Sequence, residues 1–141
     1  MRFMLLRKAD PATEAGTMPS RELAKAMMDY HEEMGRHLKI LGGDGLHPSI
    51  RGKRVKFADG KPVVIDGPFA ETKELVAGYT LVEAASWDEM MAWALRWPAV
   101  LEEANVTLEI RQVYELEDFG DVFTGEVKEA YDRALGQTAG R

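Results

Sequence analysis

Asp66 is the residue of this chain best suited to acid–base chemistry. It follows an apolar run at residues 63–65 and stands directly before Gly67 and Pro68. A carboxylate at the end of a buried strand loses part of its hydration, which raises its pKa toward values useful for proton transfer. The same carboxylate could instead cap the free N–H groups of the turn, as aspartate often does beside glycine and proline. Both roles stay open from the sequence.

Two histidines are the candidate proton carriers beside Asp66, because histidine titrates closest to neutral pH. His31 lies at the edge of an apolar helical stripe, where a histidine more often serves packing than catalysis. His47 follows a glycine-rich stretch at residues 42–45, which we expect to be a loop that brings His47 near the sheet. The sequence therefore predicts an acid–base pair of Asp66 with His47 or with His31.

Charged and polar side chains around the same turn could bind an anionic ligand. Lys73 could hold the anion, with Glu71 as its ion-pair partner and Thr72 between them. The alternative is a surface ion pair worth less than about 1 kcal/mol. Arg54, in a basic cluster, is a second candidate anion clamp or simply part of a solvated strand face. Tyr79 is expected to direct its hydroxyl along the apolar side of the sheet, where it could orient a ligand or be a core residue.

The elements that must position these residues are strands and two main helices. Ser20 and Ser86 are predicted N-caps of the two helices. Asp59 and Gly60 are typical of a hairpin turn. The strand expected at residues 75–84 has apolar residues at both odd and even positions, which favours cover on both of its faces. Apolar or alternating segments predict strands at residues 2–7, 53–58, 62–65, 75–84 and 105–115.

This order of elements predicts one antiparallel sheet, hairpin included, with helices on one face, which is the α+β class. One domain is expected over residues 1–120. An extension over residues 121–141 would hold a short helix at 126–135 and a frayed tail. Trp93 and Trp97 fall beside the apolar face of the second helix and indicate a subunit contact. With an uncovered sheet face, they favour a homodimer.

Composition excludes several classes of function. The 141 residues include no cysteine, which rules out disulfides and thiolate chemistry and fits a reducing compartment. A net charge of −6 argues against nucleic-acid binding. The three histidines show no metal-ligand spacing, so we expect no metal site. Since no apolar run approaches the length of a signal peptide or a membrane span, a cytoplasmic protein is expected.

Four motifs follow one another along the chain. They are GGDGLHPS at residues 42–49, GKRVKF at 52–57, DGPFAETKE at 66–74 and EIRQVYELEDFG at 109–120. In order and spacing they resemble the YCII-related family, in its DGPF-type subgroup, and the likeness extends over about residues 2–120. Most members of that family have no assigned reaction. The resemblance therefore implies a fold and a pocket, and no particular substrate.

The fold that this resemblance implies is a ferredoxin-like unit, paired across a two-fold axis into a dimeric α+β barrel. In the wider family a histidine on the first helix pairs with an aspartate in a proposed active site. The matching helix position here holds Met27, one turn before His31. A few relatives are similar to lactone isomerases and dehydrohalogenases, which move protons on small oxygenated rings without a cofactor.

Two functions remain open at this point. The first is a cofactor-independent enzyme in which Asp66 works with a histidine, and Lys73 or Arg54 holds an anionic or oxygenated substrate. The second is a non-catalytic dimeric binding or accessory protein. DGPF-type proteins often accompany extracytoplasmic-function sigma factors, which implies a regulatory role. An enzyme predicts Asp66 and a histidine together in an enclosed pocket, whereas a binding module predicts a broad exposed surface.

Overall fold

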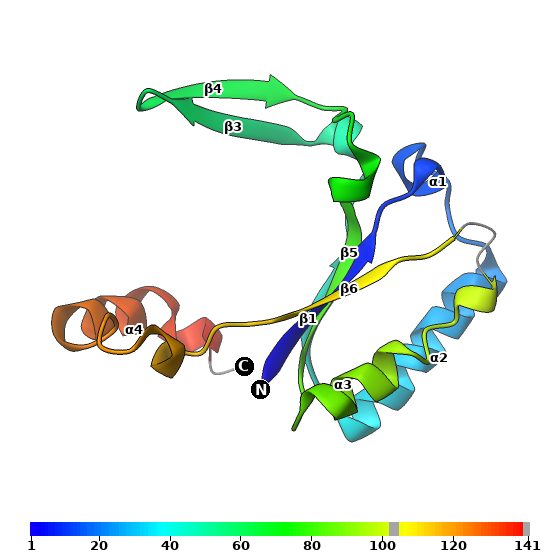
Figure 1. The fold of residues 1–141 in the computed structure, drawn as a ribbon. Coiled ribbons are helices and arrows are strands. Elements are labelled where there is room, and N and C mark those ends of the chain that lie inside the picture. The colour runs from blue at the N-terminus through cyan, green and yellow to red at the C-terminus, as the bar shows by residue number, and fades with distance from the viewer. Residues whose placement is uncertain (102–104, 140–141) are drawn as a thin grey trace.

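The computed structural model describes residues 1–101 and 105–139, and it has the predicted α+β architecture. Four antiparallel strands form a sheet in the order β2-β5-β1-β6, and helices α2 and α3 cover one of its faces (Figure 1). Without the β3–β4 hairpin, the chain order β-α-β-β-α-β and this strand order make a ferredoxin-like split unit. These elements are β1 (Arg2–Lys8), α2 (Arg21–His37), β2 (Lys39–Gly45), β5 (Val76–Glu83), α3 (Trp87–Ala94) and β6 (Leu108–Gln112).

The core lies between the sheet and the two helices. Alternate residues of β1, Phe3 and Leu5, point into it and are almost fully buried. The remaining core residues are Tyr30, Met34, Leu38, Val82, Ala84, Met90, Trp93 and Ala94. The Tyr30 hydroxyl donates a hydrogen bond of 2.8 Å to the Trp93 carbonyl, which ties α2 to α3. Burial of Tyr30 raises the pKa of its hydroxyl to about 12, so this donor keeps its proton at neutral pH.

Both predicted helix starts are confirmed. The Ser20 hydroxyl accepts from the backbone N–H of Leu23, and the Ser86 hydroxyl accepts from that of Glu89. An N-cap oxygen stabilises a helix because the first N–H groups have no partner inside it. A further short helix, α1 (Pro11–Glu14), lies between β1 and α2.

The hairpin of β3 (Lys53–Ala58) and β4 (Lys61–Asp66) is confirmed, but it is not part of the main sheet. It forms a separate two-stranded sheet that projects from one end of the molecule (Figure 1). Asp59 and Gly60 both have positive φ, 52° and 76°, as the predicted two-residue turn requires. We call residues 53–66 the arm.

The glycine-rich stretch before His47 forms an edge strand, β2, and the prediction of a loop there was wrong. Gly43 explains the difference, because a Cβ at this position would lie 2.8 Å from the Tyr79 carbonyl oxygen. The missing side chain lets β2 approach β5 closely. Glycine disfavours strands in general, so the sequence pattern pointed away from this pairing.

Trp93 and Trp97 pack in or against the core, whereas the sequence predicted them beside the apolar face of the second helix. Trp93 is only 7% exposed and belongs to the core, and Trp97 packs against it. Leu95, directly after the end of α3, is 80% exposed. The reason is that α3 ends at Ala94, so residues beyond it no longer follow the helical period. The inference of a subunit contact through Trp93 was therefore wrong.

The C-terminal part of the chain lies on the opposite side of the sheet from α2 and α3 (Figure 1). It contains a 3-10 helix, η4 (Leu116–Phe119), and helix α4 (Gly125–Ala139), which confirms and lengthens the short helix predicted there. Helix α4 also extends through residues 136–139, where a frayed tail was predicted, so that prediction was wrong for these residues. Residues 140–141 of the tail lie outside the described part of the chain. Among the described residues, no helix is both long and apolar enough to cross a membrane.

Candidate functional site

The DGPF turn forms the foot of the arm. The Gly67 N–H donates to the Gly52 carbonyl at 3.0 Å, and the Gly67–Pro68 peptide bond is cis. A Cβ on Gly67 would lie 1.7 Å from the Ser49 carbonyl oxygen. Only glycine therefore fits at this position. The Arg54 guanidinium lies 3.9 Å from the centre of the Phe69 ring, so the first strand of the arm packs on the same turn.

Ser49 and Glu14 clamp this turn to the rest of the chain. Ser49 is buried in the 3-10 helix η1 (Ser49–Arg51), and its hydroxyl donates to Glu14 Oε2 at 2.5 Å. The Ser49 N–H donates to Glu14 Oε1 at 3.0 Å. The Phe69 N–H in turn donates to the Ser49 hydroxyl at 3.0 Å. Sequence reasoning missed both residues, since 35 positions separate them and no periodicity links them.

Replacing Ser49 with alanine is expected to lower the free energy of unfolding by about 2–4 kcal/mol. The substitution removes one hydrogen bond to a carboxylate and leaves the Phe69 N–H without its acceptor. Urea unfolding would measure the loss. Ser20→Ala, which removes an exposed helix cap worth about 1 kcal/mol, is the matched control. Equal losses in the two variants would show that the clamp contributes no more than an ordinary cap.

Asp66 does not occupy the enclosed position that acid–base catalysis would favour. Its side chain is 72% exposed, and its Oδ1 lies 2.5 Å from Lys53 Nζ, directly across the hairpin. Neither the expected loss of hydration nor the expected cap of the turn occurs in the single chain. The cause is the projection of the arm, which leaves this end of β4 uncovered. An exposed ion pair of this kind contributes less than about 1 kcal/mol.

Within the described residues, His31 and His47 have hydrogen-bond partners other than Asp66. His31 Nδ1 is 2.8 Å from the Met27 carbonyl oxygen and therefore carries the proton. Its Nε2 lies 3.1 Å from the Thr80 hydroxyl. His47 is exposed, and its Nε2 lies 3.2 Å from Arg51 Nη1. No hydrogen bond or ion pair joins Asp66 to either histidine within the described residues.

The candidate ligand residues divide between two places. Glu71, Thr72 and Lys73 lie at the 3-10 helix η2 (Thr72–Glu74), which links the DGPF turn to β5. In the described chain, Glu71 and Lys73 are exposed and form no ion pair with each other, which corrects the suggested pairing. Tyr79 lies within β5, and its hydroxyl makes a long hydrogen bond of 3.5 Å to Asp44 Oδ2.

The sheet face that carries Tyr79 is open. Phe3 and Leu5 point toward the helices, so the even-numbered residues of β1 point to the opposite face. Their partners across β5 extend this face, with Met4 opposite Leu81 and Leu6 opposite Tyr79. No helix of the described chain packs on it in the way that α2 and α3 cover the other face (Figure 1). The expected cover on both faces of β5 is therefore absent from the single chain.

Two grooves lie near the C-terminal segment, away from the DGPF turn. The larger has a volume of about 350 Å³, and the Arg2 guanidinium lies beside it, paired with both oxygens of Glu115 at 2.9 and 3.1 Å. Hydrogen bonding to Glu115 raises the pKa of the Arg2 guanidinium. The lining residues are Arg2, Glu115, Leu116, Glu117, Tyr131, Asp132 and Gly136. The expected pocket at the DGPF turn is not one of these two.

Fold and site together define a ferredoxin-like α+β domain with one open sheet face and a projecting hairpin arm. The chain belongs to the YCII-related family, whose YCII-related domain matches residues 1–117. Helix α4 lies outside the matched residues.

Two similar proteins extend this comparison. An uncharacterized protein of Rhizobium meliloti (strain 1021) is 41% identical over 49 residues, which are 35% of this chain and 40% of that protein. The matched part is thus less than half the length of that curated relative. A solved structure of 5-chloro-2-hydroxyhydroquinone dehydrochlorinase from Burkholderia phenoliruptrix, in complex with 2,5-dihydroxybenzoquinone, aligns with a TM-score of 0.47 and 15% identity, covering 84% of this chain and 98% of that chain.

Proposed function

We propose that this chain forms a homodimer that binds a small oxygenated or anionic compound on its open sheet face, beside the DGPF turn. The observation that carries the proposal is the polar pair of Tyr79 and Asp44 beside the apolar side chains of Met4, Leu6 and Leu81 on this face. The ion pair of Glu109 and Arg111, on β6, borders the same apolar side chains on the other side. Small-molecule sites are commonly apolar, with a few polar groups that orient the ligand. A second copy facing the first would form an α+β barrel and would enclose this face.

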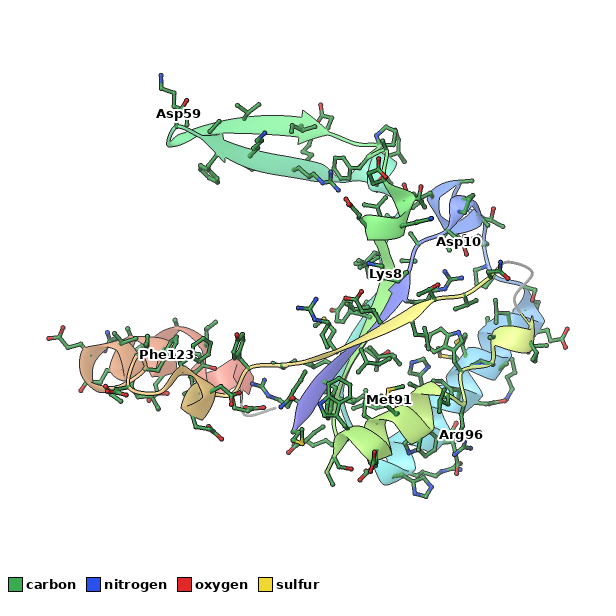
Figure 2. All side chains as sticks on the ribbon, in the orientation of Figure 1. Lys8, Asp10, Asp59, Met91, Arg96 and Phe123 are labelled. Atoms are coloured by element: carbon green, nitrogen blue, oxygen red, sulfur yellow. The ribbon has the colours of Figure 1, made fainter. Side chains whose placement is uncertain are left out.

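Positive charge near this end of the sheet favours an anionic ligand. Figure 2 shows Lys8 at the end of β1, below the arm. Lys73 is exposed on the link between the DGPF turn and β5. Arg54 lies above the turn on Phe69, with its guanidinium donors still able to bind an anion. These three cations come from different elements: Lys8 is paired with Val76 at the start of β5, Lys73 lies on η2 just before β5, and Arg54 lies on the Phe69 ring.

Acid–base catalysis is the further step of the same proposal. Asp66 would exchange a proton with the bound compound, and His47 would complete the pair, as in an isomerase or lyase that needs no cofactor. His31, next to the buried Thr80, lies on the face that α2 covers and is the less suitable partner. In the single chain, the Asp66 carboxylate forms an ion pair with Lys53. The step therefore requires that dimer formation cover Asp66 and bring a histidine of either copy within hydrogen-bond reach.

Ligand binding is expected to depend on Tyr79 and Lys73. The protein would be titrated with a panel of small hydroxylated aromatic compounds and carboxylates, and its NMR chemical shifts would be followed. At least one compound should bind near these residues. Tyr79→Phe and Lys73→Ala should each weaken its binding about tenfold, which corresponds to about 1.4 kcal/mol. Lys25→Ala, which removes an exposed cation from α2, should bind normally. If no compound bound, or if all three variants bound alike, the proposed site would be wrong.

An accessory role beside an extracytoplasmic-function sigma factor is the second candidate. The exposed acidic 3-10 helix η4, with Glu117 and Asp118, favours it because such a surface suits a basic protein partner. In the experiment above, a chain that binds none of the compounds but co-elutes with a purified sigma factor would support this second function in place of the first.

A further inference from the structure

The arm exposes apolar side chains that a solitary hairpin would not sustain in water. Phe57 is 70% exposed and Val64 61%. An isolated two-stranded hairpin is marginally stable at best, and clustered exposed apolar residues usually mark an interaction surface. The other exposed apolar residues of the arm are Val55, Val63 and Ile65. We therefore expect another surface to pack on the apolar side chains of the arm.

The arm is also basic. It carries four cations, Lys53, Arg54, Lys56 and Lys61, against the two carboxylates of Asp59 and Asp66. Lys53 and Arg54 are engaged at the foot, with Asp66 and Phe69 respectively. Lys56 and Lys61 are exposed toward the outer end of the arm. The surface that covers the arm is therefore expected to be both apolar and acidic.

The C-terminal segment of the same chain, residues 114–135, has these two properties. Its exposed apolar side chains are Tyr114, Phe119, Val122, Val127 and Leu135. Its acidic residues are Glu115, Glu117, Asp118, Asp121, Glu126, Glu129 and Asp132, against only Lys128 and Arg133. Four aromatic rings contact one another in a row, Tyr114–Phe119–Phe123–Tyr131, in tilted and edge-on pairs with centroid separations of 4.7, 4.8 and 5.7 Å, and they support this surface. The segment thus complements the arm in both charge and apolar surface.

The two surfaces cannot meet within one chain. The arm leaves one end of the sheet and α4 lies at the other, both on the side away from α2 and α3 (Figures 1 and 2). A two-fold axis across the strands would place each arm over the other copy's C-terminal segment. Such an arrangement forms two identical contacts and closes on itself, as dimer interfaces do.

We propose that the arm of each copy binds the C-terminal segment of a second copy, so that residues 53–66 of one chain lie against residues 114–135 of the other. This inference rests on the homodimer of the proposed function and specifies how the two copies hold each other. It also gives helix α4, outside the residues that match the family, a part in assembly. The acidic groove around Glu117 and Asp132 would receive cations of the arm.

Paired charge reversals test this contact. One variant carries Lys56→Glu and Lys61→Glu in the arm, and the other carries Asp121→Lys and Glu126→Lys in the segment. Each variant alone would place like charges at both contacts, so its dimer dissociation constant is expected to rise at least tenfold. An equimolar mixture would restore both contacts, because the reversed arm then meets the reversed segment. Sedimentation velocity would measure the dimer dissociation constant of each variant and of the mixture. Low ionic strength is used because charge pairs act most strongly there.

The outcomes separate this inference from the proposal beneath it. Weak self-association of each variant, with dimers recovered on mixing, is the expected result. If each variant alone dimerised as tightly as the unaltered chain, the homodimer would stand and the arm–segment contact would be wrong. If the unaltered chain were monomeric at about 100 μM, both would be wrong, because a stable dimer is tighter than that. Circular dichroism would verify folding, which these exposed positions should not affect.

Discussion

Gly67→Ala is expected to detach the arm from the body of the protein. The added Cβ would lie 1.7 Å from the Ser49 carbonyl oxygen and 2.6 Å from the Ser49 carbonyl carbon. Both are backbone atoms, and the Ser49 carbonyl also accepts from the Gly52 N–H, so they cannot swing aside as a side-chain tip would. We expect a loss of at least about 3 kcal/mol, the upper end for overpacking.

Limited proteolysis and urea unfolding would measure this effect. If the foot opens, cleavage within residues 51–66 should become much faster than in the unaltered chain. Gly42→Ala is the control, because a Cβ there has no atom within 4 Å and no unfavourable φ. It should change the stability by less than about 1 kcal/mol. A Gly67→Ala protein as stable and as resistant as Gly42→Ala would refute the close contact with Ser49.

Local sequence signals predicted the elements of this fold well. The Asp59-Gly60 turn and the serine caps of α2 and α3 each act over a few residues, and the structure has all of them. Strand β2 was not predicted, because the need for glycine at Gly43 comes from the backbone of β5, where its partner Thr80 is 37 positions later in the chain. The position of the arm escaped for a similar reason. Alternation sets which residues share a hairpin face, but it does not say which sheet the hairpin joins.

The site was predicted only in part. The DGPF motif marked a structurally constrained turn, at which Gly67 and Phe69 hold the foot of the arm. Its chemistry was assigned to Asp66, whose carboxylate pairs with Lys53 on the surface. The hydrogen-bond partners at this place are the buried Ser49 of η1 and the half-buried Glu14 of α1, and nothing in a single sequence links two residues that are 35 positions apart. A motif therefore located the turn, while the contacts that explain the motif required the tertiary structure.

Trp93→Ala is expected to destabilise the fold itself, by about 3–5 kcal/mol. The indole is buried between α2 and α3, with the Tyr30 ring 6.4 Å and the His37 ring 5.4 Å from its own. The Arg96 guanidinium covers it at 4.2 Å. Truncation to alanine would leave a cavity at the junction of the two helices. Urea unfolding at several protein concentrations is the measurement.

The concentration dependence decides between a core role and an interface role for Trp93. For a dimer that unfolds as it dissociates, the unfolding midpoint rises with protein concentration. A core residue lowers the midpoint equally at every concentration, whereas an interface residue would also shift the dimer dissociation constant measured by sedimentation. Trp87→Ala is the control, because that indole is 41% exposed and touches Phe3 only at its edge. A folded Trp93→Ala protein with weakened dimers and unchanged monomer stability would show that Trp93 acts in the dimer interface and not in the core.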